Sequence, residues 1–166
     1  MRTEKNISVF LVDDDKMFNR SLEHHLQHKL DPGVRISSFL SGEECLRHLD
    51  EHPDIIVLDH ALNSTNPFAL DGTEVLRMIR QKEPSARVIM LSGQKKMEVA
   101  IDSMRNGADD YVVKNDNVFL RILQAIHNAA GRIRYRRQMR NNKRRSLISL
   151  AIIIVLAGIL YAVKIL

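Results

Sequence analysis

The sequence predicts an α/β fold, with a five-stranded parallel sheet covered by helices on both faces, and a hydrophobic helix after it. Three observations lead to this prediction. Short runs rich in Val and Ile alternate with segments of helical spacing up to Lys114, and strands that alternate with helices form parallel sheets. Polar residues directly follow several of these runs. Residues 147–163 form an apolar stretch without charge.

The five apolar runs are short and nearly continuous, as expected for strands that are buried on both faces. We expect strands at residues 7–12, 34–40, 54–58, 87–91 and 111–113. No solenoid-like repeat interrupts the alternation of strands and helices.

The intervening segments are typical of helices. Phe18, Leu22, Leu26 and Leu30 recur at helical spacing. Ser41 and Glu44 have the spacing of a capping box, and Gly107 is a residue type that often ends helices. We expect helices at residues 15–30, 41–50, 71–82 and 95–106, and a last one that begins near residue 116.

Chemically distinctive side chains stand at the ends of four of these strands. The first strand is followed by Asp13 and Asp14, the third by Asp59, the fourth by Ser92 and the fifth by Lys114. The carboxyl ends of parallel strands lie at one edge of the sheet, where active groups gather. We therefore expect these five side chains to lie close together.

Three carboxylates at one edge repel one another, and a divalent cation would offset that repulsion. Mg²⁺ binds through few carboxylates and keeps several waters, which suits an open edge. Lys114 and the Ser92 hydroxyl would then contact phosphoryl oxygens, with Asp59 as the nucleophile. The alternative is an acidic sheet edge without chemistry, which the ordered placement at four strand ends disfavours.

The segments VFLVDDDKMF, DIIVLDH, VIMLSG and GADDYVVKN, together with Asp71-Gly72, resemble the response-regulator receiver domain of two-component signalling. The resemblance covers about residues 6–130 and implies a flavodoxin-like doubly wound sheet of strand order 2-1-3-4-5. It implies the following roles: Mg²⁺ ligation by Asp13, Asp14, Asp59 and the backbone carbonyl of Ala61; catalysis by Asp59, Ser92 and Lys114, with Asp59 as phospho-acceptor; and switching by Ser92 and Tyr111.

The sequence departs from the receiver pattern at two positions that border this edge. Asn115 replaces the proline, usually joined by a cis bond, that follows the lysine in the family, and leaves the conformation of the Lys114–Asn115 bond open. The loop after Asp59 is also longer than usual before Asp71-Gly72 is reached.

Charge separates the chain into parts. Residues 1–131 hold 16 Lys and Arg against 20 Asp and Glu, a net charge of −4, whereas residues 132–166 hold 9 basic residues and no acid. An acidic globule with 5% aromatic residues argues against nucleic-acid binding. The single Cys45 fits a reducing compartment. We expect a receiver domain at 1–131, a basic linker at 132–145 and a transmembrane helix at 146–166.

The membrane prediction rests on two neighbouring segments. Seventeen helical residues from 147 to 163 would extend about 25 Å, and continuation to residue 166 approaches the hydrocarbon thickness of a bilayer. Residues 132–145 carry eight Lys and Arg, which are retained on the cytoplasmic side and attract anionic lipid. We expect a single-pass protein of the bacterial cytoplasmic membrane, with the receiver domain in the cytoplasm and membrane lipid as a partner. The alternative is a buried helix or one that pairs with a soluble partner.

These features together predict a two-component response regulator without a separate output domain. A sensor histidine kinase or phosphotransfer protein would phosphorylate Asp59. Output would come from protein contact, including a dimer through the fourth and fifth helices, or from acting as a phosphate sink. Enzymatic activity would be limited to autophosphotransfer and self-dephosphorylation. The alternative is a receiver-like scaffold that binds a membrane partner independently of phosphorylation.

Overall fold

The computed structural model describes residues 6–62, 68–93 and 97–165; within its last helix, the side chains of residues 141, 144–147 and 150–165 lie outside the description. The chain forms two compact units, residues 1–130 and 131–166. The first contains the sheet and its helices, and the second continues the last helix.

The first unit is built on a parallel sheet of five strands in the order β2-β1-β3-β4-β5. The strands are β1 (Ile7–Val12), β2 (Val34–Phe39), β3 (Ile55–Asp59), β4 (Arg87–Ser92) and β5 (Asp110–Val113). This topology confirms the predicted α/β class and strand order. Four of the five strands differ from their predicted bounds by one residue at one or both ends. Two of these differences concern the site, because Asp59 and Ser92 are the last residues of β3 and β4.

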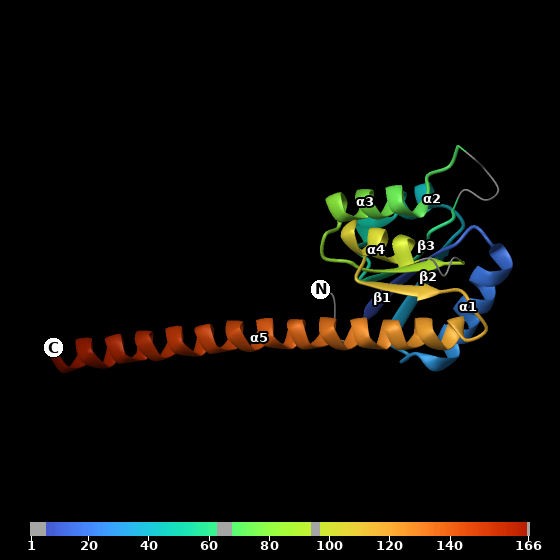
Figure 1. Ribbon diagram of the computed structural model, residues 1–166. Helices are drawn as coiled ribbons and strands as arrows, with labels where there is room; N and C mark the ends of the chain where they lie inside the picture. Colours follow the sequence, from blue (N-terminus) through green and yellow to red (C-terminus); the bar gives the residue numbers. More distant parts are fainter. Residues whose placement is uncertain (1–5, 63–67, 94–96, 166) are drawn as a thin grey trace. The chain divides into compact units, whose positions relative to one another are not determined.

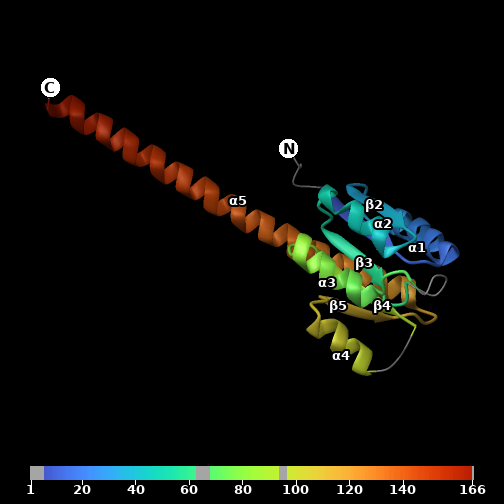
Figure 2. The same ribbon diagram turned by 90° about the horizontal axis from the view of Figure 1, so that it is seen from above.

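Among the described residues, five α-helices accompany the sheet: α1 (Lys16–Lys29), α2 (Gly42–Arg47), α3 (Gly72–Lys82), α4 (Met97–Arg105) and α5 (Val118–Ile165). Figures 1 and 2 show α2, α3 and α4 on one face of the sheet, and α1 with the beginning of α5 on the other. The second predicted helix is shorter than expected, since α2 ends at Arg47 and a 3₁₀ turn, η1 (Leu49–Glu51), follows.

Side chains from alternate strand positions supply the core under α2 and α3. Phe10 and Phe39 pack edge to face with ring centroids 4.8 Å apart, and Ile79 from α3 is fully buried beside them. Each such side chain contributes roughly 1.5–3 kcal/mol on burial. Cys45 is buried here as predicted, and burial, followed by the nearby Glu44 charge, raises the pKa of its thiol to about 12.

Side chains at the helix ends satisfy backbone groups there. The Asp15 carboxylate accepts from the backbone N–H groups of Met17 and Phe18 and so caps α1. A complete capping box joins Asp71 and Glu74 at α3. The box predicted at Ser41 is half formed, because the Glu44 carboxylate accepts from the Leu40 N–H.

Within the part of the chain that the structure describes, no helix combines the length and the apolar character required to cross a membrane. The backbone of α5 extends to Ile165. Most side chains of the predicted span at 146–166 lie outside the described residues.

The close approach of α2 to α3 at Gly42 predicts that a larger side chain at this position will destabilise the fold. A Cβ atom added at Gly42 would lie 2.2 Å from Cγ2 of Val75, a buried and stiff side chain. Gly42→Ala should therefore lower the free energy of unfolding by about 1–3 kcal/mol through overpacking, measured by urea denaturation.

Val75→Ala removes the obstructing methyl group and provides the matched control. The double variant Gly42→Ala/Val75→Ala should lose less stability than the sum of the single variants, because the clash is absent. If the double variant lost as much free energy of unfolding as the two single variants together, Gly42 and Val75 would not be in steric conflict.

Candidate functional site

Three carboxylates converge at the carboxyl ends of β1 and β3. These strands are parallel neighbours in the sheet, so Asp13 and Asp14 after β1 lie beside Asp59 at the end of β3. One oxygen from each carboxylate falls within 4.8 Å of the others. Asp13 and Asp59 are buried, and Asp14 is half-buried. The structure thus brings together the acidic residues predicted from the sequence.

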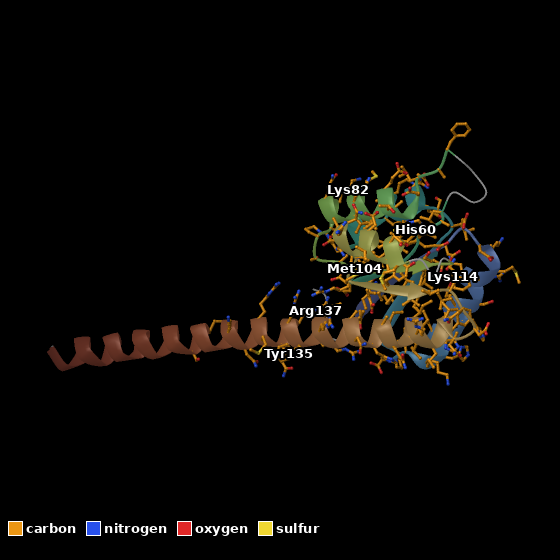
Figure 3. The ribbon with its side chains drawn as sticks, in the orientation of Figure 1. His60, Lys82, Met104, Lys114, Tyr135 and Arg137 are labelled. Carbon is orange, nitrogen blue, oxygen red and sulfur yellow. The ribbon has the colours of Figure 1, made fainter. Side chains whose placement is uncertain are left out.

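Lys114 reaches this cluster from the loop after β5, and its ammonium lies between two of the carboxylates. Its Nζ is 2.7 Å from Asp13 Oδ2 and 2.9 Å from Asp59 Oδ2. The Lys114 N–H also donates to the Ser92 carbonyl, 2.8 Å away, which holds the lysine backbone against the end of β4. Figure 3 labels Lys114 and His60 at this end of the sheet.

The electrostatics of the site are those of a charged cluster with limited access to water. Burial lowers the pKa of Lys114, but attraction to Asp59 and hydrogen bonds to Asp13 and Asp59 more than offset it, leaving this pKa above its ordinary value. Burial, together with the negative charge of Asp59, raises the pKa of Asp13 to about 6 despite the lysine. The lysine therefore offsets only part of the cost of burying the Asp13 charge beside Asp59.

The donor set fits a hard divalent cation. Among the described residues, Asp59 Oδ1 is one of two buried side-chain polar atoms without a hydrogen-bond partner. A buried oxygen without a partner is costly, and hard cations such as Mg²⁺ bind carboxylate oxygens. Asp13, Asp14 and Asp59 together could therefore hold Mg²⁺.

The remaining predicted residues occupy different parts of the same edge. Ser92 ends β4 and is buried, with 2% of its surface exposed. Tyr111 in β5 is half-buried and packs against the core under α2 and α3. Ala61 lies two residues after Asp59 and is exposed.

Asn115 occupies the position at which receiver domains usually have a proline. No cis peptide bond occurs among the described residues, so the bond after Lys114 is trans. The Asn115 side chain accepts from the Asn117 N–H at 3.2 Å, and its carbonyl accepts from the Val118 N–H at 2.9 Å. Asn115 therefore forms the turn that leads into α5.

The long loop after Asp59 returns close to the acceptor. Residues 63–67 of this loop lie outside the described residues. At its end, the Leu70 N–H donates to the Glu43 carboxylate at 2.8 Å, a bond that lowers the pKa of Glu43. A Cβ atom at Gly72 would lie 2.2 Å from the Asp59 carbonyl oxygen, so glycine allows α3 to begin directly against the site.

Two residues at this edge were not predicted to contribute to the site. The Phe18 ring lies under Lys114, with Nζ 4.6 Å from the ring centroid. Buried Asn19 donates to the Phe39 carbonyl at 2.9 Å and to the Asp13 carbonyl at 3.4 Å. Helical spacing places Phe18 in the apolar stripe of the first helix, and such periodicity does not distinguish a core position from a contact with a charged group.

A five-stranded doubly wound sheet with an acidic cluster and a lysine at its carboxyl edge defines a receiver domain. The family model described as the response regulator receiver domain matches residues 9–126. The chain belongs to this family, whose members take part in two-component signalling with histidine kinases or phosphotransfer proteins.

Similar proteins include one of nearly the length of the match and one of more than twice that length. The chain is 34% identical over 121 residues to the chemotaxis protein CheY of Listeria monocytogenes, which covers 72% of this chain and 96% of CheY. It is 36% identical over 107 residues to the transcriptional regulatory protein PrrA of Mycobacterium leprae, covering 64% of this chain but only 42% of PrrA.

Solved structures agree with the fold. The BeF₃-activated DrrB receiver domain has a TM-score of 0.64 and 30% identity, and the match covers 75% of this chain and 97% of that one. The receiver domain of a LuxO repressor protein from Vibrio parahaemolyticus has a TM-score of 0.70 with 19% identity, covering 81% and 97%. The second similarity shows the fold alone.

The raised pKa of Asp13 predicts how metal binding depends on pH. A carboxyl whose folded pKa is raised from 3.8 to about 6 stabilises the fold when protonated, and that contribution is lost as the pH rises through about 6. Above this pH, the ionised carboxylate is available to Mg²⁺. Mg²⁺ should therefore raise the melting temperature more at pH 7.5 than at pH 5.

The expected stabilisation at pH 7.5 is about 1.4 kcal/mol when free Mg²⁺ is tenfold above its Kd. Differential scanning calorimetry at both pH values would measure it. Asp13→Asn, which removes the titrating carboxyl, should reduce the Mg²⁺ response at both pH values. An equal Mg²⁺ response of the wild-type protein at pH 5 and 7.5 would contradict the role of Asp13.

Proposed function

We propose that this protein is a membrane-anchored response regulator that accepts a phosphoryl group on Asp59. The observation that carries the proposal is the position of the Asp59 carboxylate. It is buried beside Asp13, lies 2.9 Å from the Lys114 ammonium and keeps one oxygen without a partner among the described residues. A carboxylate of this kind is a suitable nucleophile for phosphoryl transfer.

In the proposed transfer, an Asp59 carboxylate oxygen attacks phosphorus of a phosphohistidine on a kinase or phosphotransfer protein. The new O–P bond forms as the N–P bond breaks, and the donor imidazole leaves with the bonding electron pair and is protonated. Lys114, already within hydrogen-bonding distance of Asp59, stabilises the added negative charge. The Ser92 hydroxyl, from the end of β4, donates to another phosphoryl oxygen.

Asp13, Asp14 and Asp59, with the backbone carbonyl of Ala61, are the residues that would hold Mg²⁺. When bound, the ion would neutralise charge on the phosphoryl oxygens and orient them. The reverse half of the cycle is hydrolysis, in which water attacks phosphorus, inorganic phosphate leaves and the Asp59 carboxylate is restored.

We propose that the signal leaves through the face formed by α4, β5 and α5. Ser92 and Tyr111 would reorient after phosphorylation. On α4, Met97, Ile101 and Met104 recur at helical spacing and are 45–73% exposed, and Leu120 of α5 is 53% exposed. Exposed apolar side chains of this kind mark interaction sites and support a dimer or another protein partner.

We propose that residues 146–166 anchor the protein in the bacterial cytoplasmic membrane as a single transmembrane helix. The support is the amino-acid sequence: residues 147–163 carry no charge and include 11 Ile, Leu and Val. The described basic side chains that precede them, such as Arg136, Arg140 and Lys143, are exposed and would contact anionic lipid on the cytoplasmic side.

A phosphorylation-independent scaffold is the second candidate function. The trans bond at Asn115 is the observation that favours it, since the lysine loop lacks the usual proline. The two candidates differ in whether Asp59 carries phosphate when the protein acts.

Phosphorylation can be tested on the full-length protein in detergent. Incubation with acetyl phosphate and Mg²⁺ should add one phosphoryl group, detected by Phos-tag electrophoresis and intact-mass spectrometry. Asp59→Asn should abolish the addition, because the amide is not a nucleophile. Lys114→Ala should slow it roughly 10–100-fold, since a hydrogen bond to a charged group contributes about 1.5–3 kcal/mol.

Lys82 is an exposed lysine at the end of α3 and is labelled in Figure 3, so Lys82→Ala is a matched control that should retain the wild-type rate. Equal phosphate incorporation by the wild-type and Asp59→Asn proteins would exclude Asp59 as the acceptor. Wild-type protein that takes up no phosphate from acetyl phosphate or from a histidine kinase would favour the scaffold.

Membrane anchoring is tested by fractionation of cells that express the full-length chain. The protein should sediment with membranes and resist a carbonate wash, because about 17–20 apolar helical residues span a bilayer. Deletion of residues 146–166 should release it, apart from weak binding by the basic segment that disappears at high salt. Recovery of the full-length chain in the soluble fraction without detergent would contradict the anchor.

A further inference from the structure

Phe18 stands in the first turn of α1, next to the acidic cluster. Its N–H donates to the Asp15 carboxylate at 3.0 Å, and the Asp15 N–H in turn donates to Asp13 Oδ1 at 3.0 Å. This chain of bonds fixes the start of α1 relative to Asp13. The aromatic ring is half-buried, and the ammonium of Lys114 lies over it.

The contact between the ring and Lys114 has the geometry of a cation–π interaction. Nζ lies 4.6 Å from the ring centroid, within the distance of about 6 Å at which the ring face attracts a cation. An ammonium has three N–H donors. Two carboxylate oxygens, one from Asp13 and one from Asp59, lie within hydrogen-bonding distance of this ammonium. The face of the Phe18 ring attracts the positive charge from a third direction.

Phe18 is itself held in place by α5. The Phe119 ring meets it edge to face, with centroids 5.4 Å apart and an interplanar angle of 68°. The Phe119 ring also contacts His25 of α1, with ring centroids 5.5 Å apart. Because α5 begins directly after the Lys114–Asn115 turn, the segment that carries the lysine also supports the ring beneath it.

The lysine needs such support in this chain. The proline that usually follows it in receiver domains would fix a backbone dihedral, but Asn115 does not. The Lys114 backbone is tied to β4 by one hydrogen bond to the Ser92 carbonyl. Beyond its backbone, the lysine side chain is constrained by its carboxylate partners and by the Phe18 ring.

We propose that Phe18 is a positioning residue for Lys114, whose ring keeps the ammonium between Asp13 and Asp59 in place of a proline constraint. A cation–π contact imposes little direction on the N–H bonds. The ammonium can therefore exchange an Asp13 oxygen for an incoming phosphoryl oxygen while it remains over the ring. This inference rests on the proposed phosphorylation of Asp59.

The test compares side chains that keep or remove the ring. Phe18→Leu removes the ring at similar volume, and Phe18→Tyr retains it. The first readout is the NMR signal of the Lys114 side chain in protein without phosphodonor. Its ring-current shift should disappear in Phe18→Leu and persist in Phe18→Tyr.

The second readout is the rate of phosphorylation by acetyl phosphate. Phe18→Leu should slow it roughly 2–30-fold, the range that corresponds to a cation–π contact, whereas Phe18→Tyr should restore the wild-type rate. Phe10→Leu is a control for lost aromatic packing, because this buried ring packs against Phe39. It should lower stability without removing the Lys114 ring-current shift.

The outcomes separate this inference from the proposed function. A wild-type ring-current shift in Phe18→Leu overturns the positioning role, whether or not the protein is phosphorylated. If the wild type is phosphorylated, an equal rate for Phe18→Leu also overturns it. Absence of phosphorylation in wild type refutes the proposed function alone, and the Lys114 spectrum of the variants still decides where the ammonium is held.

Discussion

The functional edge of this receiver domain depends on one ammonium group placed between two buried carboxylates. Lys114 Nζ lies 2.7 Å from Asp13 and 2.9 Å from Asp59, and without it these charges would meet in a region that water barely reaches. The lysine offsets this cost only in part, because burial, followed by the charge of Asp59, still raises the pKa of Asp13 to about 6. An edge with residual negative charge is suited to a divalent cation and, through that cation, to a phosphoryl group.

The surrounding structure holds these charges together at close range. Asn19 ties the ends of β1 and β2 through the Phe39 and Asp13 carbonyls. Gly72 lets α3 begin against the Asp59 carbonyl, where any side chain would collide. These contacts involve backbone atoms of the site, so they constrain its geometry without changing its charge. The core beneath α2 and α3 includes buried side chains of β1 and β3, the strands that lead to Asp13 and Asp59.

The departure from the family pattern after Lys114 shows how one constraint can replace another. Asn115 forms a turn into α5 with a trans bond, and the lysine side chain lies over the Phe18 ring. The ring is braced by Phe119, so α1 and the start of α5 share the task of holding a residue from the β5 loop.

The sequence by itself determined the fold and the acidic set. The alternation of apolar runs and helices predicted the parallel sheet, and parallel strands necessarily bring Asp13, Asp14 and Asp59 to one edge. Only the tertiary structure decided that Phe18 faces Lys114 and that Asn19 bonds to strand ends. The periodicity of apolar residues predicts which side chains are buried, but it does not predict which residues they contact. Those contacts depend on how α1, β2 and α5 pack, and residues far apart in the chain set that packing.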